Sequence, residues 1–242
     1  MKKIPIILAL VAVALVAYSM STWGDKKSVK ASKTITTETR NVSDFHKIEV
    51  SGAFDVDVTY GAEEKVEVEV PENLQEYVKV YTRGGKLFIE TDGKTSFKSS
   101  CDLLVHVKTA RLNEFELSGA SSIKLNNTLK DDAFSLESSG ATAFKGKLDV
   151  QEVEMDLSGA SNAIIEGRAT KALVDLSGAS HLEDFEFEID EAFIDLSGAS
   201  SAKITSLKSI KADVSGASSL YYKGNPAKND VIKSGASSVK KK

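Results

Sequence analysis

The sequence DLSGAS occurs at residues 156–161, 175–180 and 195–200, and close variants precede and follow these three copies. We call the SGAS segment and its variants the glycine word. Their glycines are Gly52, Gly119, Gly140, Gly159, Gly178, Gly198, Gly216 and Gly235. From Gly119 onward, successive glycines are 18 to 21 residues apart. Self-similarity at a nearly fixed period of this length predicts stacked repeat units rather than a conventional globular domain.

Apolar and polar residues alternate on both sides of the glycine word. Met155 and Leu157 lie four and two residues before Gly159, and Ala163 and Ile165 lie four and six residues after it. Period-two alternation predicts strands with one buried face, and the units lack the spacing of three and four that is typical of a helix. We therefore expect two short strands in each unit.

Two strands in about 19 residues, with a corner at the glycine, predict one coil of a parallel β-helix. Neighbouring coils would hydrogen-bond at a spacing of about 4.8 Å. Glycine tolerates the backbone angles of a tight corner, and Ser and Ala leave room inside it. A leucine-rich repeat has a similar period, but it requires Leu-x-x-Leu-x-Leu-x-x-Asn, and this chain lacks the Asn and alternates like a strand there.

The beginning of the chain predicts a secretory signal over residues 1–19. Lys2 and Lys3 precede an apolar run of 15 residues from Ile4 to Tyr18, and small polar residues follow. A membrane-spanning helix needs about 20 apolar residues. An uncleaved N-terminal anchor is the alternative, and lipid attachment at a Cys at the end of the signal is excluded because no Cys stands directly after the run. Residues 20–38 are expected to be a mobile, polar lead-in.

The remaining sequence divides into a less regular β region, residues 39–110, and the regular coils, residues 111–242. The first part carries an early glycine word and a hairpin predicted over Tyr77–Thr91, which turns at Gly84 and Gly85. The stretch between Gly52 and Gly119, which are 67 positions apart, is expected to form either a small antiparallel region or distorted coils. In the last unit Lys233 and Lys241 take inward positions, which predicts a polar cap over an open sheet edge.

Charge and cysteine content narrow the classes of partner. The full chain has 31 basic and 35 acidic residues, and removal of the signal leaves a net charge of −6. Such a protein gains no attraction to nucleic acid or to anionic lipid, so neither nucleic-acid binding nor membrane insertion after signal cleavage is expected. Cys101 is the single cysteine, so the fold depends on its core rather than on internal disulfides. The sequence does not indicate an oligomeric state.

An acidic residue stands three positions before the glycine in six successive units. These residues are Glu116, Glu137, Asp156, Asp175, Asp195 and Asp213. Stacking in register would form one outward column, in which neighbours repel by about 1 kcal/mol even in water. Hydration together with hydrogen bonds from the adjacent Ser is one way to offset this repulsion. The alternative is a bound Ca²⁺ ion, with Asp156, Asp175 and Asp195 as its ligands. Crowding is expected to raise some of the pKa values.

The same column suggests a catalytic alternative. Paired carboxylates about 5–5.5 Å apart serve glycoside hydrolysis, so a cation-dependent polysaccharide-active enzyme is the alternative function. Every coil carries the acid equally, however, and Arg168 is the only Arg after Gly119. The glycine word also lacks the Lys and helix of a phosphate loop. We expect no catalytic residues and no cofactor, and a periplasmic scaffold is a second alternative.

Three stretches carry a resemblance to a known family. They are FHKIEVSGAFDVDVTYG at residues 45–61, GGKLFIETDG at residues 84–93, and the serial LSGAS units. Over about residues 39–238 the chain resembles the head GIN domain family, proposed autotransporter adhesins common in Bacteroidota. The resemblance implies a single-stranded, right-handed β-helix. It also implies an exported protein of the periplasm, outer surface or medium, which acts as an adhesive or structural module toward a surface protein or glycan.

Overall fold

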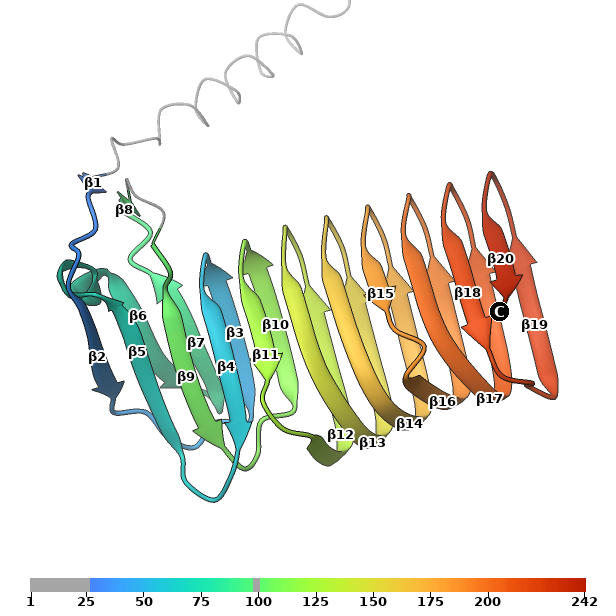
Figure 1. The fold of residues 1–242 in the computed structure, drawn as a ribbon, viewed down its shortest axis with the longest axis horizontal. Helices are drawn as coiled ribbons and strands as arrows, with labels where there is room; N and C mark the ends of the chain where they lie inside the picture. Colours follow the sequence, from blue (N-terminus) through green and yellow to red (C-terminus); the bar gives the residue numbers. More distant parts are fainter. Residues whose placement is uncertain (1–26, 98–100) are drawn as a thin grey trace, which may run out of the picture.

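The computed structural model describes residues 27–97 and 101–242, and the expected signal at residues 1–19 lies outside them. The described chain is a solenoid whose coils stack along one axis (Figure 1). The regular coils are built from β10 (Glu114–Gly119), β11 (Ser122–Leu125), β12 (Leu129–Ser138), β13 (Ala143–Leu157), β14 (Asn162–Leu176), β15 (His181–Glu183), β16 (Phe187–Leu196), β17 (Ser201–Val214), β18 (Ser219–Lys223), β19 (Lys228–Lys233) and β20 (Ser238–Lys241). The predicted parallel β-helix is confirmed.

Successive coils pair in parallel and bring equivalent residues into register. Leu157 is the partner of Leu176, and Leu176 is the partner of Leu196. All three side chains are at most 1% exposed, so they form one interior file. A leucine-sized side chain that leaves water contributes roughly 1.5–3 kcal/mol before entropy is counted. Because each coil buries its inward side chains against its neighbours, stability is shared among the coils rather than held by one.

The glycine word is required by both conformation and space. Gly178 has a φ of +69°, which residues other than glycine rarely adopt. A Cβ atom at this position would lie 2.6 Å from the carbonyl oxygen of Gly159 in the preceding coil. The same carbonyl accepts a hydrogen bond of 2.7 Å from the backbone N–H of Ala179. Each corner therefore rests directly on the backbone of the previous corner, which explains why the word recurs.

The second corner of each regular coil has no glycine word. β13 and β14 run unbroken through it, from the end of one word to the start of the next. In β13 the alternation slips by one residue at Gln151 and Glu152, which are both exposed, so the strand bends there. Thr170 Oγ1 of the next coil donates to Gln151 Oε1 at 2.9 Å. The two expected strands of one coil are thus merged into a single bent strand.

The N-terminal region packs on the outer side of the first coil instead of lying between two coils. Its elements are β1 (Lys27–Val29), β2 (Ile35–Arg40), β3 (Lys47–Gly52), β4 (Asp55–Tyr60), β5 (Lys65–Pro71), the 3-10 helix η1 (Glu72–Tyr77), β6 (Val78–Arg83), β7 (Lys86–Thr91), β8 (Thr95–Phe97) and β9 (Leu104–Thr109). β3 and β4 pair in parallel with β10 and β11 on one side, and with β7 and β9 on the other. The chain therefore passes to the outer end and returns, so the register across the 67-residue gap is unbroken.

Both structures expected for that gap are present. β7 and β9 form one irregular coil, while β2, β5 and β6 add antiparallel strands outside it. The predicted hairpin is confirmed, because β6 pairs with β7 and both Gly84 and Gly85 have positive φ. Part of the lead-in is not mobile as expected: β2 pairs with β5 over six residues, and β1 pairs with β8. Alternating Thr and charged side chains in β2 suit a half-exposed edge strand.

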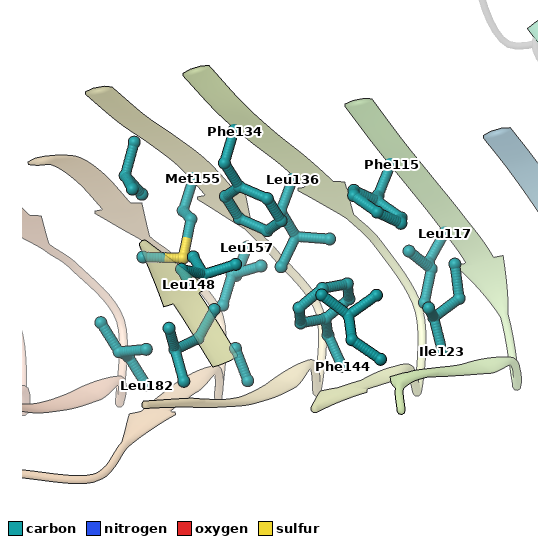
Figure 2. Close-up of a cluster of buried hydrophobic side chains, with 14 of the residues drawn as sticks. Phe115, Leu117, Ile123, Phe134, Leu136, Phe144, Leu148, Met155, Leu157 and Leu182 are labelled. Carbon is teal, nitrogen blue, oxygen red and sulfur yellow. The ribbon is translucent and has the colours of Figure 1, made fainter. Parts of the chain in front are cut away.

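The core is continuous along the solenoid and contains an aromatic cluster near the start of the regular coils. Phe115, Phe134 and Phe144 have ring centroids 5.2 to 5.5 Å apart, and Figure 2 shows them among Leu136, Leu148 and other buried side chains. At the C-terminal end, Lys233 and Lys241 are in register with Val214 and Tyr222, which agrees with the expected polar cap. Among residues 27–97 and 101–242, no helix has the length and apolar character needed to cross a bilayer.

Candidate functional site

Seven carboxylates form one file along the outside of the solenoid, which we call the acidic column. Its members, in register from strand to strand, are Glu49, Glu116, Glu137, Asp156, Asp175, Asp195 and Asp213. All are exposed or half-buried, because inward and outward side chains alternate along each strand. The structure thus confirms that the six predicted acids are stacked. It adds Glu49, which holds the same place before Gly52 in the early glycine word.

Lys86 closes the N-terminal end of the acidic column. Its Nζ lies 2.6 Å from the Glu116 carboxylate and 3.2 Å from Glu49 Oε2. Burial opposes the charge on this ammonium, but the hydrogen bonds and attraction from Glu116 and Glu49 outweigh burial and raise the pKa of Lys86. At the other end, the column position after Asp213 is taken by Ile232. Lys86 was not singled out in the sequence, because it meets these acids only through the parallel pairing of β7 with β3.

The middle of the acidic column is crowded. The pKa of Asp175 is raised, first by partial burial and then by repulsion from Asp195 and Asp156. This agrees with the expected direction, although burial rather than crowding is the larger cause. The adjacent serines do not serve the carboxylates as expected: Ser158 Oγ donates to the carbonyl oxygen of Ser138, and Ser215 Oγ to that of Leu196, each at 3.2 Å.

The three predicted metal ligands lie in successive coils. Asp156, Asp175 and Asp195 are in register, but the described residues contain no group of three His, Cys, Asp or Glu side chains placed to hold a metal ion. Strands in a sheet are about 4.8 Å apart, so the outer two aspartates are separated by about twice that spacing. Oxygen ligands lie about 2.3–2.6 Å from a Ca²⁺ ion. The register therefore suits pairs of neighbouring carboxylates better than a three-aspartate site, and Ca²⁺ binding stays a prediction.

A shallow hollow of about 240 Å³ follows the N-terminal half of the acidic column. Its walls include Glu116, Glu137 and Asp156, together with the serines beside them. Carboxylate and hydroxyl oxygens accept hydrogen bonds, so this surface suits a ligand that presents cationic or other donor groups. Its lining residues come from four successive coils, so an extended partner can contact several coils at once.

Two apolar side chains lie next to the acidic column. Leu173 and Phe193 are partners in the neighbouring file, and Leu173 is 50% exposed. The ammonium of Lys171 lies 6.0 Å from the centroid of the Phe193 ring. The sequence signal for this patch is the replacement of an outward polar residue by Leu or Phe two positions before the acid. The patch gives the acidic face a local apolar contact surface.

In most words the last residue is a serine that lies inside the corner, and at Ser161 its hydroxyl hydrogen-bonds within the corner. Ser161 Oγ donates to the carbonyl oxygen of Ser158 at 2.6 Å and accepts from Thr142 Oγ1 at 3.0 Å, and Ser138 and Thr142 share a further hydrogen bond. These hydroxyls are buried, so they are not available to a ligand. Of the two serines in the word, only the first faces the solvent beside the acidic column.

Comparisons with known proteins agree with this fold. The family model described as "Putative auto-transporter adhesin, head GIN domain" matches residues 44–226. A crystal structure of a "putative adhesin" from Bacteroides fragilis has 21% identity and a TM-score of 0.85, and covers 88% of this chain and 100% of its own. A "putative adhesin" from Parabacteroides distasonis has 21% identity, the same coverage and a TM-score of 0.72. A "putative lipid binding protein" from Parabacteroides distasonis has 16% identity, the same coverage and a TM-score of 0.69. No curated protein matches the chain.

Proposed function

The chain belongs to the head GIN domain family, and from this premise we propose that it is an exported, non-catalytic module that adheres to a surface partner through its acidic face. The observation that carries the proposal is the acidic column: seven carboxylates held in register by consecutive parallel strands. Proposed export follows from the basic and apolar segment at residues 1–19, and the family's adhesin description agrees with a surface protein.

The spacing of the acidic column supports adhesion to a partner with repeated donor groups. Backbone hydrogen bonds between coils fix the positions of the carboxylates, so little ordering cost remains when a partner binds. A partner that carries several donor groups can engage several coils at once, and the linked contacts strengthen one another without any single deep pocket. Charge complementarity then favours a basic surface protein or an amine-bearing glycan over an acidic one.

The same regularity argues against a catalytic role. Acid–base catalysis needs neighbouring groups with different protonation states and different tasks. Along the acidic column each coil presents the same group at the same position, with no nucleophile or base added to one pair. The exception, Lys86, makes ion pairs with Glu49 and Glu116 and so neutralises charge at the end of the column. A binding surface requires no such differentiation.

The test compares two variants of the mature chain that carry the same change in charge. One neutralises the acidic column (Asp156→Asn, Asp175→Asn and Asp195→Asn), and the other neutralises exposed acids elsewhere (Glu63→Gln, Glu72→Gln and Glu76→Gln). Adhesion is measured on immobilised basic proteins and amine-bearing glycans, at low and high salt. We expect the column variant to lose adhesion by about tenfold or more, since several charge contacts are removed together.

The control variant should adhere like the unmodified chain. High salt should weaken the adhesion of both of these proteins. Equal adhesion of the two variants would remove the acidic column from the proposal. Turnover of acidic polysaccharides that Asp175→Asn abolishes would show instead that the protein is an enzyme. The assays therefore include a reducing-end measurement on those polysaccharides with and without Ca²⁺.

A further inference from the structure

We propose that a hollow at the second corner of the solenoid, between two irregular coils, binds a neutral sugar unit of a glycan. This site is separate from the acidic column and does not depend on it. The hollow has a volume of about 580 Å³ and spans four successive coils, from Thr128 in the first to Phe185 in the fourth. Ligand pockets of proteins commonly measure about 300–1,000 Å³, so one or two sugar rings fit the space.

Both ends of the hollow are coils that carry extra residues. Lys124 pairs with Lys145, whereas Leu129 pairs with Leu148, so the coil between β11 and β12 has two additional residues. Ile164 pairs with Glu183, and pairing resumes between Gly167 and Phe187. The β15–β16 connection therefore has one additional residue compared with the matching stretch of β14. Figure 1 shows a loop at both places. Local insertions of this kind redirect side chains and are enriched beside functional sites.

The second insertion is held in a strained conformation. Asp184 has a φ of +125°, which is rare for a residue other than glycine. Its Oδ1 accepts a hydrogen bond of 3.0 Å from the backbone N–H of Glu186, which stabilises the loop. The loop places Phe185 on the wall of the hollow as a half-buried side chain, and Lys223 Nζ lies 4.6 Å from the centroid of its ring. A regular coil would not display an aromatic ring there.

The floor is formed by the two regular coils between the insertions. Arg168 is 73% exposed and its Nε donates to Asp149 Oδ1 at 2.7 Å. Gly167 lies beside it with a φ of +102°, and a Cβ there would collide with the carbonyl oxygen of Leu148 at 1.9 Å. Only glycine fits this position of the floor. Because a guanidinium carries five N–H donors, Arg168 can hold Asp149 and still donate to a ligand.

The chemistry of these walls matches a sugar. An aromatic ring offers a face for the C–H groups of a pyranose, and planar ionic side chains hydrogen-bond to its hydroxyls. The walls carry three cationic side chains and four carboxylates; the cations are Lys130, Lys147 and Arg168, and the carboxylates are Asp149, Glu166, Glu186 and Glu188. An acidic sugar gains no net attraction from this balance, whereas a neutral sugar uses both donors and acceptors.

The test measures binding of the mature chain to a panel of neutral and uronate-containing oligosaccharides by calorimetry and ligand-observed NMR. Two variants alter the hollow, Phe185→Ala and Arg168→Ala. Their matched controls are Tyr221→Ala, whose ring also has a Lys ammonium nearby, and Arg111→Ala, whose guanidinium forms an exposed pair with Asp44. Each hollow variant should weaken binding of a neutral oligosaccharide by about tenfold, the size of effect expected for one stacking or ionic contact.

The controls should bind as the unmodified chain does, and thermal unfolding of each variant shows whether it is folded. If Phe185→Ala unfolds, the exposed Arg168→Ala carries the test alone. The inference is overturned if no neutral oligosaccharide binds, if only uronate-containing ones bind, or if the folded hollow variants bind as well as their controls. Adhesion through the acidic column can persist in any of these cases, because the two sites lie on different parts of the coil.

Discussion

Asp175 and Asp195 are paired residues of adjacent parallel strands, with their carboxylates on the same outward face. Like charges directly opposite each other destabilise a sheet. The pKa of Asp175 is raised by its partial burial and by the repulsion of Asp195 and Asp156, so the folded chain holds a proton there more tightly than the unfolded chain does. The ionised Asp175 carboxylate therefore reduces the stability of the fold near neutral pH.

Asp175→Asn is expected to stabilise the protein at pH 7. Because the folded-state pKa is above the ordinary value of 3.8, the stability that Asp175 contributes falls as pH rises from 3.8 through the raised pKa. Removing the charge should raise the free energy of unfolding by no more than about 1 kcal/mol, since solvent screens the site. The gain should disappear below pH 3.8. Thermal unfolding across pH, with Glu63→Gln as control, measures both effects, and a loss of stability at pH 7 would contradict the explanation.

Gly178→Ala is expected to destabilise the solenoid strongly. The substitution places a side chain at a φ of +69° and brings its Cβ to 2.6 Å from the backbone oxygen of Gly159. Strain and displacement of a stacked corner should together cost about 2–4 kcal/mol. Gly61→Ala is the control, because a Cβ there has nothing within 4 Å, and its effect should stay within about 0.5 kcal/mol. Denaturant unfolding compares the two, and equal costs would refute the stacked-corner explanation.

Leu176 and Leu173 allow a test of the core within one strand. Leu176 is fully buried in the interior file, whereas Leu173 is 50% exposed on the acidic face. Leu176→Ala should cost about 2–5 kcal/mol, because it leaves a cavity between coils. Leu173→Ala should cost less than about 1 kcal/mol. Chemical unfolding monitored by circular dichroism separates these values, and a reversed order would mean that the inward and outward faces were wrongly assigned.

Lys233 and Lys241 are expected to prevent self-association of the protein through the C-terminal end of the solenoid. They occupy the file of Val214 and Tyr222, so each places a charge where an inward apolar side chain would extend the core. Lys233→Val with Lys241→Val would leave an apolar, unpaired edge, which is a template for further strand pairing. Sedimentation at increasing concentration should then show self-association. The matched change Lys240→Val, at an outward position of β20, should not, and a monomeric double variant would remove the proposed cap.

Calcium is expected to have little effect on stability. Asp156, Asp175 and Asp195 would have to converge from three successive coils on one ion, and the described residues contain no group of three His, Cys, Asp or Glu side chains placed to do so. A ligand that binds the folded chain and is present at 100 times its dissociation constant would add about 2.7 kcal/mol to the free energy of unfolding. Thermal unfolding with millimolar Ca²⁺ and with EDTA checks this directly. A clear rise in Tm that the triple substitution of Asp156, Asp175 and Asp195 abolishes would establish the cation site instead.

Much of the architecture follows from local sequence, because each coil repeats the same short-range constraints. A glycine at one corner of every coil, apolar residues at alternate positions, and an acid three residues before every repeated glycine except Gly235 are all visible without the fold. Identical neighbours in a stack then acquire identical environments, so the interior file of Leu157, Leu176 and Leu196 and the acidic column from Glu116 to Asp213 could both be predicted. The merging of two strands into one bent strand at Gln151 has no residue signature and was not foreseen.

The tertiary structure decided the features that depend on long-range pairing or on small differences between coils. Glu49 joins Glu116, and Lys86 reaches both, because the chain between β4 and β10 travels to the outer end of the solenoid and returns. The hollow beside Phe185 exists because two coils three steps apart contain extra residues that have no room in the stack. The repeated coil is encoded in local sequence, since every coil obeys the same local geometry. Where residues distant in sequence meet is set by packing of the whole chain, which no local pattern encodes.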